Sequence, residues 1–394
     1  MKIFHTADWH LGKLVQGVYM TEDQAFILDQ FIAAIKEEKP DAVIIAGDLY
    51  DRAVPPTEAV QLLTRVLDEI VLELETPVLS IAGNHDSPSR LDFGSKIMTE
   101  KGLHIVGQFE KNHSPVILHD TYGEVHFHLI PYCDPSVVRY TLQDDSIKTH
   151  DDATKQIIAN IKKTMDKKAR HVYVGHAFVT AFGEKEANTS ESERPLSIGG
   201  AEHVNAVHFA DFHYTALGHL HKAHYVKDET IRYAGSPLKY SISEEKHQKG
   251  YYIVELDEKG NAHIEKHTLT ARRNMRTVEA KIEELLHMPV NEDYVHVKLM
   301  DESPVLSPME KVRSVFPNAM HVERKFDGMI NTLEKTAVKK RHELTDIELF
   351  QAFYKEVKGF EASEETKEIF TEALDDLLKV ENETVDQKEE VVTN

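Results

Sequence analysis

The chain has 394 residues, 41% of them hydrophobic, so it is long enough for two or three domains around a large buried core. It carries 46 basic and 67 acidic side chains, and the net charge of −21 excludes a general electrostatic attraction for nucleic acid. A single cysteine, Cys133, excludes an internal disulfide, and no segment reaches the apolar length of a membrane span. We expect a cytoplasmic protein without a signal peptide, since the first residues run directly into a strand.

The first 130 residues alternate predicted strands and helices, which is typical of an α/β domain. Helical spacing of apolar residues predicts a helix over residues 21–38, with Thr21 as its N-cap. A second helix is predicted over residues 57–73, with Val60 among the apolar residues on its buried face.

Shorter strands follow. Strand alternation places His126 and His128 on one face, and we expect that face to be solvated because no glycine turn follows these residues. Further along the chain, two runs of alternating residues on either side of Asp257–Gly260 predict a β-hairpin.

Five apolar runs each end in Asp, His or Asn side chains. In an α/β sheet, ligand-binding groups gather beyond the carboxyl ends of the strands. We therefore expect these side chains to form one metal centre. They are Asp8 and His10, Asp48, Asn84, His176, and His219 and His221.

The types of these side chains indicate the metal and the reaction. Nitrogen and oxygen ligands without a thiolate suit manganese, iron or zinc better than magnesium. Seven ligands are more than one ion takes from an open catalytic site, so they predict two ions roughly 3.5–4 Å apart. Asp48 has two oxygens and could bridge both ions. Such a pair stabilises in-line displacement at phosphorus, because the ions neutralise the charge that builds on the phosphate oxygens.

Other polar residues of the same loops have different predicted roles. His85 follows Asn84 on extended chain and points to the opposite side, so we expect it to donate a proton to the leaving group. The alternative is that His85 only hydrogen-bonds the loop. Asp51 and Asp86 are predicted to brace the loops and not to bind metal.

Three basic residues lie in loops at the rim of the predicted site. They are candidates for contacts with phosphate groups, and the alternative is that each is an ordinary solvated residue. These residues are Lys13, Arg52 and Arg90.

The composition of the chain changes near residue 271, and strands and helices alternate again up to residue 328. The predicted domains are the metal-bearing domain 1–270, an α+β cap domain 271–328, a linker 329–344, a helical segment 345–380 and an acidic tail 381–394.

The first helix of the helical segment has an apolar stripe. It is too aromatic for an isolated helix, so we expect it to dock on a partner. The predicted docking residues are Leu349, Phe350, Phe353, Tyr354 and Val357.

The motifs resemble the calcineurin-like metallophosphoesterase superfamily and, within it, the SbcD family of nuclease subunits of bacterial SbcCD complexes. The resemblance covers essentially the whole chain. It implies an α/β fold in which a β-sandwich is flanked by helices (α/β/β/α), followed by the small α+β cap domain and by C-terminal partner-binding helices. The stretches that carry it are residues 5–13, 47–51, 83–91, 218–221 and 233–237.

The resemblance also implies roles for individual residues. His85 would be the catalytic histidine, and the cofactors would be two divalent ions, most commonly manganese. One ion would be held by Asp8, His10, Asp48 and His221, and the other by Asp48, Asn84, His176 and His219.

By the same resemblance, the protein would be a hydrolase with single-strand endonuclease and double-strand 3′-to-5′ exonuclease activity. It would act in DNA repair, recombination, replication and hairpin processing, associated with the nucleoid. A homodimer would bind an SbcC-like coiled-coil ATPase through the C-terminal helices, which makes a heterotetramer. The partner and the two cations would supply the positive potential for DNA that this acidic chain lacks.

Two other functions stay open on the sequence. A small-molecule phosphodiesterase or phosphatase would use the same ions, although a cap domain and an aromatic helix exceed what a small substrate needs. A non-catalytic regulatory subunit of an ATPase would be expected to lose ligands, and here the ligand set is intact.

Overall fold

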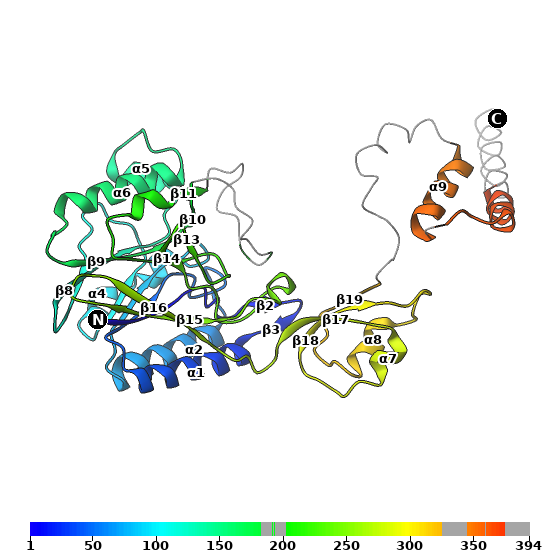
Figure 1. Cartoon of the computed structure of the whole chain (residues 1–394), viewed down its shortest axis with the longest axis horizontal. Coiled ribbons are helices and arrows are strands. Elements are labelled where there is room, and N and C mark those ends of the chain that lie inside the picture. Colours follow the sequence, from blue (N-terminus) through cyan, green and yellow to red (C-terminus); the bar gives the residue numbers. More distant parts are fainter. Residues whose placement is uncertain (183–190, 192, 194–201, 325–344, 359, 375–394) are drawn as a thin grey trace, which may run out of the picture. The chain divides into compact units, whose positions relative to one another are not determined.

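The computed structural model describes residues 1–182, 191, 193, 202–324, 345–358 and 360–374 (Figure 1). The predicted linker 329–344 and acidic tail 381–394 lie outside the described residues. By spatial contacts the chain divides into two compact units. The first comprises residues 1–278, 289–297 and 312–321, and the second comprises residues 279–288, 298–311 and 322–394.

The first of two six-stranded sheets has the order β16-β15-β1-β4-β5-β6. Its central strands β1, β4, β5 and β6 run parallel, and β15 runs antiparallel to β1. Their carboxyl ends therefore meet at one edge, where the loops after β1, β4 and β5 begin. The strands are β16 (Ala262–Thr268), β15 (Gly250–Leu256), β1 (Lys2–Thr6), β4 (Ala42–Ile45), β5 (Val78–Ile81) and β6 (Leu103–Val106).

The second sheet has the order β13-β14-β12-β9-β8-β7. Its four inner strands run parallel, and the two outer strands are antiparallel to their neighbours. His176 is the last residue of β9, and His219 directly follows β12. The strands are β13 (His224–Val226), β14 (Asp228–Tyr233), β12 (Tyr214–Gly218), β9 (Arg170–His176), β8 (Gly123–Ile130) and β7 (Val116–Asp120).

Helices cover the outer face of each sheet. The first sheet packs against α1 (Thr21–Glu38) and α2 (Thr57–Asp68), and the second against α5 (Pro135–Leu142) and α6 (His150–Thr164) (Figure 1).

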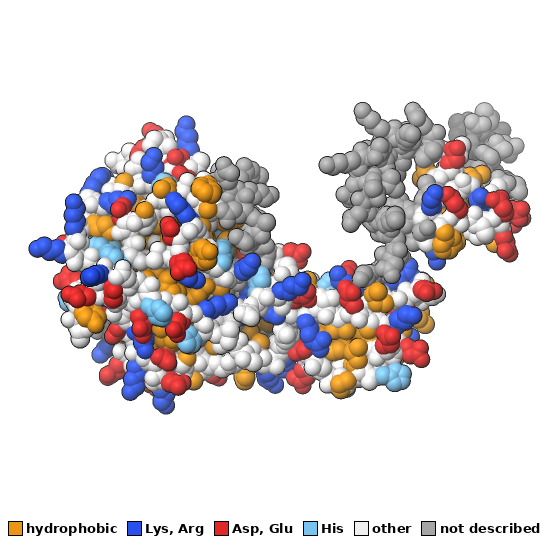
Figure 2. Space-filling model, in the orientation of Figure 1, with side chains coloured by type: hydrophobic (Ala, Val, Ile, Leu, Met, Phe, Trp, Pro, Cys, Tyr) orange, Lys and Arg blue, Asp and Glu red, His pale blue; other side chains and the backbone are white. Residues whose placement is uncertain are grey.

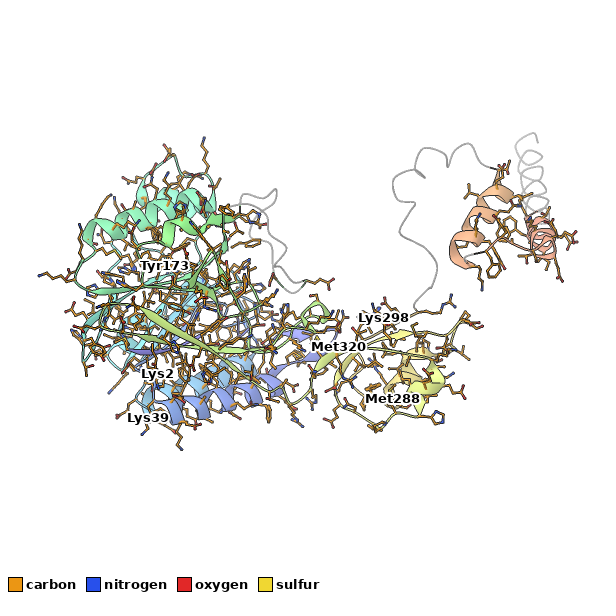
Figure 3. All side chains as sticks on the ribbon, viewed as in Figure 1. Lys2, Lys39, Tyr173, Met288, Lys298 and Met320 are labelled. Carbon is orange, nitrogen blue, oxygen red and sulfur yellow. The ribbon has the colours of Figure 1, made fainter. Side chains whose placement is uncertain are left out.

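Three hydrophobic clusters fill the spaces between these layers. Phe31 belongs to the cluster under α1 and α2, Phe127 to the cluster between the sheets, and Tyr173 to the cluster under α5 and α6. Figure 3 labels Tyr173 between the second sheet and α6. The layers therefore follow the order α/β/β/α, which confirms the predicted fold class.

The two long helices of the first sheet differ from the prediction in detail. The N-cap of α1 is Met20, which makes no side-chain capping bond, so Thr21 is the first helical residue and not the cap. After α2 the chain continues as one turn of π-helix, η1 (Glu69–Glu73). Val60 is 41% exposed, so its predicted burial is wrong; the buried residues of α2 are Ala59, Leu62, Leu63, Val66 and Leu67.

Short elements complete the structure. Those before residue 270 are β2 (Leu14–Val15), β3 (Val18–Tyr19), α3 (Pro88–Leu91), α4 (Ser95–Thr99), β10 (Phe178–Thr180), β11 (His203–Asn205), η2 (Ala206–Phe209) and η3 (Ile242–Glu244). Strands β17 (Met275–Ala280), β18 (Tyr294–Leu299) and β19 (His321–Arg324) form a third sheet, and the short helices α7 (Ile282–Leu286) and α8 (Pro308–Arg313) follow β17 and β18.

Within the first unit, polar contacts hold β18 to α1. The Tyr294 hydroxyl donates to Asp23 Oδ2, and Arg273 Nη1 donates to the same oxygen at 3.0 Å. Asp23 is 1% exposed, so both donors compensate for its lost hydration.

Among the described residues, no helix combines the length and the apolar character that crossing a membrane requires.

The C-terminal helical segment contains α9 (Asp346–Lys358) and a second helix over residues 364–374. The backbone N–H of Glu348 donates to Thr345 Oγ1 and the backbone N–H of Thr345 donates to Glu348 Oε2, a capping box that fixes the start of α9. Phe350 stacks on Phe370 with ring centroids 3.9 Å apart, whereas Phe353 is 61% exposed. Part of the predicted docking face is therefore used to pair the two helices.

The predicted solvation of His126 and His128 is wrong, because the two residues are only 8% and 3% exposed. Strand β8 is covered on both faces: Phe127 packs between the sheets, and on the other face the His128 ring lies against the rings of His113 and Phe212. His171 Nε2–H donates to a backbone carbonyl at 2.7 Å, so its Nδ1 accepts from His128 Nε2–H at 3.1 Å. His126 Nε2–H donates to Glu124 Oε2 at 2.7 Å, so a side-chain partner replaces water at one nitrogen of each ring.

We predict that these buried histidines make folding sensitive to acid. Burial lowers the pKa of both His5 and His128 to about 3. Unfolded histidine binds a proton below about pH 6.5, so stability is complete above that pH and falls as the pH decreases. Each of the two histidines should lower the free energy of unfolding by about 1.4 kcal/mol between pH 7.5 and pH 5.5.

Denaturant unfolding at pH 7.5 and 5.5 would measure this loss. His5→Gln and His128→Gln should each reduce the difference between the two pH values, whatever their effect at pH 7.5. His263→Gln is the matched control, because the His263 side chain is 72% exposed. An unchanged pH difference in both buried variants would contradict the prediction.

Candidate metal centre

Backbone hydrogen bonds join the loops that follow β1 and β4. The N–H of Asp8 donates to Gly47 O at 3.0 Å, and the N–H of His10 donates to Asp48 O at 2.9 Å. Asp8, His10 and Asp48 have φ angles of 54°, 46° and 52°. Left-handed backbone is unfavourable for residues with a side chain and persists where the surroundings enforce it, which is common at functional sites.

Two glycines let these loops approach closely. A Cβ atom on Gly83 would lie 2.1 Å from Asp48 Oδ1, and one on Gly47 would lie 2.4 Å from His176 Nδ1. No larger residue fits either position without moving a candidate ligand. The glycines before Asp48 and Asn84 are thus explained by the packing of the loops against one another.

One cluster of candidate ligands contains Asp8, His10 and His221, all buried, with ligand atoms within 4.8 Å of one another. His10 Nε2 lies 3.0 Å from His221 Nε2. Two ligands about 2.1 Å from a metal ion and at right angles are about 3.0 Å apart. The geometry and the donor types therefore fit a divalent ion.

A second cluster surrounds His176. Its Nε2 lies 2.9 Å from Asn84 Oδ1, and its Nδ1–H donates to Ala46 O at 2.9 Å. Because the carbonyl can only accept, the Nε2 lone pair of the neutral ring is free for a metal. The His219 ring lies 5.4 Å from the His176 ring, and the His219 backbone N–H donates to Asp8 Oδ1 at 2.9 Å.

Asp48 lies between the two clusters. Its Oδ2 is 3.6 Å from His10 Nε2 and 3.3 Å from His176 Nε2. One carboxylate oxygen is thus within reach of ions in both clusters. All seven candidate ligands of the sequence are brought together at the carboxyl ends of the strands.

The charges of the centre are strongly coupled. Burial raises the pKa of Asp8 to about 7. Burial alone would raise the pKa of Asp48 and lower the pKa of His176. The attraction between the two side chains outweighs this effect of burial. The pKa of Asp48 therefore lies well below its usual range, and the pKa of His176 is raised to about 9. The site therefore requires positive charge to stabilise its carboxylates, which protons or divalent cations provide.

His85 lies at the half-buried side of the centre. Its Nδ1–H donates to Asp51 O at 2.8 Å, and its backbone N–H donates to Asp48 Oδ1 at 2.9 Å. Asp51 Oδ1 accepts from Lys13 Nζ at 2.6 Å and lies 3.6 Å from His10 Nδ1. Ligand atoms of His10, Asp51 and His85 also lie within 4.8 Å of one another.

Asp86 braces the loops through three backbone contacts. Its Oδ2 accepts from Gly83 N at 2.9 Å and Leu49 N at 3.1 Å, and its Oδ1 accepts from Tyr50 N at 2.9 Å. Burial, reinforced by Asp48, raises the pKa of Asp86 to about 7. Asp86 thus connects the loop that carries Asn84 to the loop that carries Asp48.

The sequence did not indicate two charged residues that lie behind His221. His221 Nδ1–H donates to Glu244 Oε1 at 3.1 Å, and Lys249 Nζ donates to Glu244 Oε2. Both residues belong to a polar stretch after residue 240 that is typical of a surface loop, so no local pattern marks them. Burial alone would raise the pKa of Glu244, but Lys249 and His221 outweigh it and lower the pKa.

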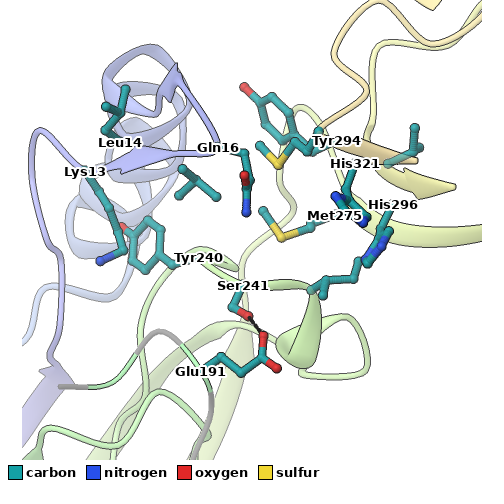
Figure 4. A pocket seen from close by; sticks show the side chains of 14 residues that line it. Lys13, Leu14, Gln16, Glu191, Tyr240, Ser241, Met275, Tyr294, His296 and His321 are labelled. Carbon is teal, nitrogen blue, oxygen red and sulfur yellow. Dashed lines mark hydrogen bonds between the residues drawn. The ribbon is translucent and has the colours of Figure 1, made fainter. Parts of the chain in front are cut away.

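A cavity of about 510 Å³ adjoins the centre. Lys13 and Tyr240 line one end, and His296 and His321 line the other (Figure 4). The centroid of the Tyr240 ring, which lines the cavity, lies 5.7 Å from that of the His10 ring.

The other two basic candidates, Arg52 and Arg90, are exposed. On the face of the molecule in Figure 2, basic and acidic side chains are interspersed and do not gather into one large basic patch. This distribution agrees with the net charge of −21.

Comparison with known proteins identifies the family. The model of the calcineurin-like phosphoesterases matches residues 1–223, and the model of the type 5 capsule protein repressor C-terminal domain matches residues 271–358. The SbcD subunit of nuclease SbcCD from Staphylococcus saprophyticus is 36% identical over 364 residues, which cover 91% of this chain and 94% of that protein. The chain belongs to the SbcD family. SbcD proteins are hydrolases that act on phosphodiester bonds, and the phosphoesterase fold of the family implies divalent metal ions.

Two solved structures are also similar. One is the protein TT1561 of Thermus thermophilus, with a TM-score of 0.39 and 10% identity, covering 68% of this chain and 99% of that chain. The other is a dimetal phosphatase from Danio rerio, with a TM-score of 0.38 and 12% identity, covering 69% of this chain and 99% of that chain.

We predict that Asp48→Ala sharply lowers the amount of bound metal, because the variant lacks a carboxylate oxygen that lies close to both His10 Nε2 and His176 Nε2. Metal-free protein dialysed against manganese chloride would be analysed for metal content. Asp145→Ala is the control, since Asp145 is exposed and remote in sequence from the ligand loops. Full metal content in a folded Asp48→Ala protein would contradict a bridging position.

Proposed function

We propose that this chain is the nuclease subunit of an SbcCD-type complex and hydrolyses phosphodiester bonds of DNA at a centre with two divalent ions, which are Mn²⁺. The observation that carries the proposal is the position of Asp48 Oδ2, 3.6 Å from His10 Nε2 and 3.3 Å from His176 Nε2. A carboxylate oxygen between two groups of nitrogen and oxygen ligands is the arrangement that a pair of ions needs. The nitrogen-rich ligand set favours manganese over magnesium.

The side chains divide the chemical work. When bound, the ions supply a nucleophile at neutral pH and neutralise charge on the phosphate oxygens. Asp8, His10 and His221 hold one side of the centre, and Asn84, His176 and His219 hold the other. Asp48 fixes the spacing between the two sides.

His85 is the proton donor in this proposal. Its Nδ1–H is held by the Asp51 carbonyl, so Nε2 is the nitrogen that takes up and releases the catalytic proton. The leaving oxygen of the substrate would then lie beside His85, opposite the attacking group.

The finer activities belong to the same proposal. They are single-strand endonuclease activity and ATP-coupled double-strand 3′-to-5′ exonuclease activity. In this proposal the chain forms a homodimer and acts together with an SbcC-like coiled-coil ATPase. Lys13 at the cavity, together with the exposed Arg52 and Arg90, is a candidate for contacts with the DNA backbone. The ions and the partner would supply most of the positive potential, since the chain itself is acidic.

A nuclease assay in manganese tests the proposal. The wild-type protein should cleave linear, hairpin or single-stranded DNA, and His85→Ala should reduce the rate by about 10²–10⁴-fold, as expected for the loss of a general acid. The variant should keep its ions, because His85 is not among the seven ligands.

Each alternative role has its own outcome. Activity of the wild type on nucleoside phosphates but not on DNA would indicate a small-molecule phosphoesterase. A His85→Ala protein that has lost bound metal would make His85 a ligand. His113→Ala is a matched control, since His113 lies outside every group of candidate ligands among the described residues.

The C-terminal helices give a prediction about the partner. Phe353 is 61% exposed on α9, so Phe353→Ala should weaken binding to an SbcC-like ATPase by at least about tenfold, as expected for a buried aromatic anchor. Cleavage of single strands by the isolated protein should not change. Tyr140→Ala, at an 86% exposed aromatic residue of α5, is the control, and equal binding by the two variants would exclude Phe353 as an anchor.

A further inference from the structure

The two nitrogens of His221 have different partners, and both are buried. Nε2 lies 3.0 Å from His10 Nε2, whereas Nδ1–H donates to Glu244 Oε1 at 3.1 Å. Glu244 is 0% exposed, so no water competes for this bond. A carboxylate behind a metal-binding histidine fixes the tautomer, orients the ring and makes the other nitrogen a stronger donor.

Lys249 holds this carboxylate in place. Its ammonium group donates to Glu244 Oε2, to His221 O at 2.8 Å and to Ser236 Oγ at 2.7 Å, which uses all three of its hydrogens. Lys249 therefore restrains both the acceptor of the His221 ring and the backbone of His221. A buried ion pair is weak evidence for stability, so its geometry toward His221 is the more informative feature.

The backbone around His221 is also closely enclosed. The N–H of Ser236 donates to His221 O at 3.3 Å, and Gly235 has a φ of 74°. A Cβ atom on Gly235 would lie 2.7 Å from His221 O. The turn after β14 thus leaves His221 little freedom to change its position.

The opposite side of the centre has a weaker arrangement. His176 Nδ1–H donates to the neutral carbonyl of Ala46, and the adjacent oxygen ligand is the neutral amide of Asn84. The His10 and His221 side has the charged carboxylate of Glu244 behind it. The two sides of the centre therefore differ in how strongly their ligands are oriented and polarised.

We propose that Glu244 and Lys249 are positioning residues for His221, and that the side of the centre with His10 and His221 binds its divalent ion more tightly than the side with Asn84 and His176. This inference rests on the two-ion centre of the proposed function. It adds an order of affinity to that centre and two residues that determine it.

Calorimetric titration of the metal-free protein with manganese chloride tests the inference. The wild type should bind two ions in a tighter and a weaker class. Glu244→Gln should weaken the tighter class by about 10–100-fold, the usual effect of losing such a partner, and leave the weaker class unchanged. His221→Ala should abolish the tighter binding of manganese. In the double variant His221→Ala with Glu244→Gln, the second substitution should then have no further effect on metal affinity.

Folding is controlled separately, since Glu244→Gln leaves the Lys249 charge buried without its partner. The variant that combines Glu244→Gln with Lys249→Met removes both charges. Its tighter manganese site should still be weaker than that of the wild type, as in Glu244→Gln alone. Asp120→Asn breaks a similarly buried ion pair with Arg170 and should lower the melting temperature without changing metal affinity. Circular dichroism would verify the fold of each variant.

The outcomes separate the two proposals. A folded double-charge variant with wild-type affinity in the tight class would overturn the inference, and so would a tight class that survives in His221→Ala. Two ions bound with equal affinity would overturn the order of affinity. A wild type that binds only one ion would contradict the two-ion centre itself, and with it the proposed function.

Discussion

A buried carboxylate between two imidazoles is the interaction on which the site depends. Asp48 is only 2% exposed and has lost its hydration, so its oxygens need nearby donors or cations. The His85 backbone N–H satisfies one oxygen, and the other lies between His10 and His176. These contacts exist only if loops from two different sheets approach within van der Waals distance, which explains the glycines at positions 47 and 83.

The sequence was informative where the signal is local. Each apolar run followed by Asp, His or Asn lies within a few residues, and parallel strands bring the ends of such runs together regardless of loop length. For this reason the α/β/β/α fold could be predicted, and so could the grouping of the seven candidate side chains at one edge. Glu244 and Lys249 could not, because their burial depends on a turn after β14 and on the packing of His221, which are distant in the chain.

Two errors concern the burial of a face. Val60 was assigned to the buried face of its helix from periodicity, and the face of His126 and His128 was taken as solvated because no glycine turn follows it. Periodicity gives which residues share a face, but not whether a second layer covers that face. The segments that hold His113 and Phe212 cover the outer face of β8, and only tertiary structure reveals them.

The left-handed backbone of Asp8, His10, Asp48 and His219 has an evolutionary consequence. Asn, Asp and His are the side-chain-bearing residues that tolerate this conformation best, and all three can also bind metal. Single mutations at these positions can therefore exchange one oxygen or nitrogen ligand for another at little conformational cost. Glu and Cys adopt this conformation less readily, so a change to a thiolate-rich, zinc-selective site would carry a conformational cost at each of these positions. The backbone thus restricts which metal preferences descendants of this protein can reach.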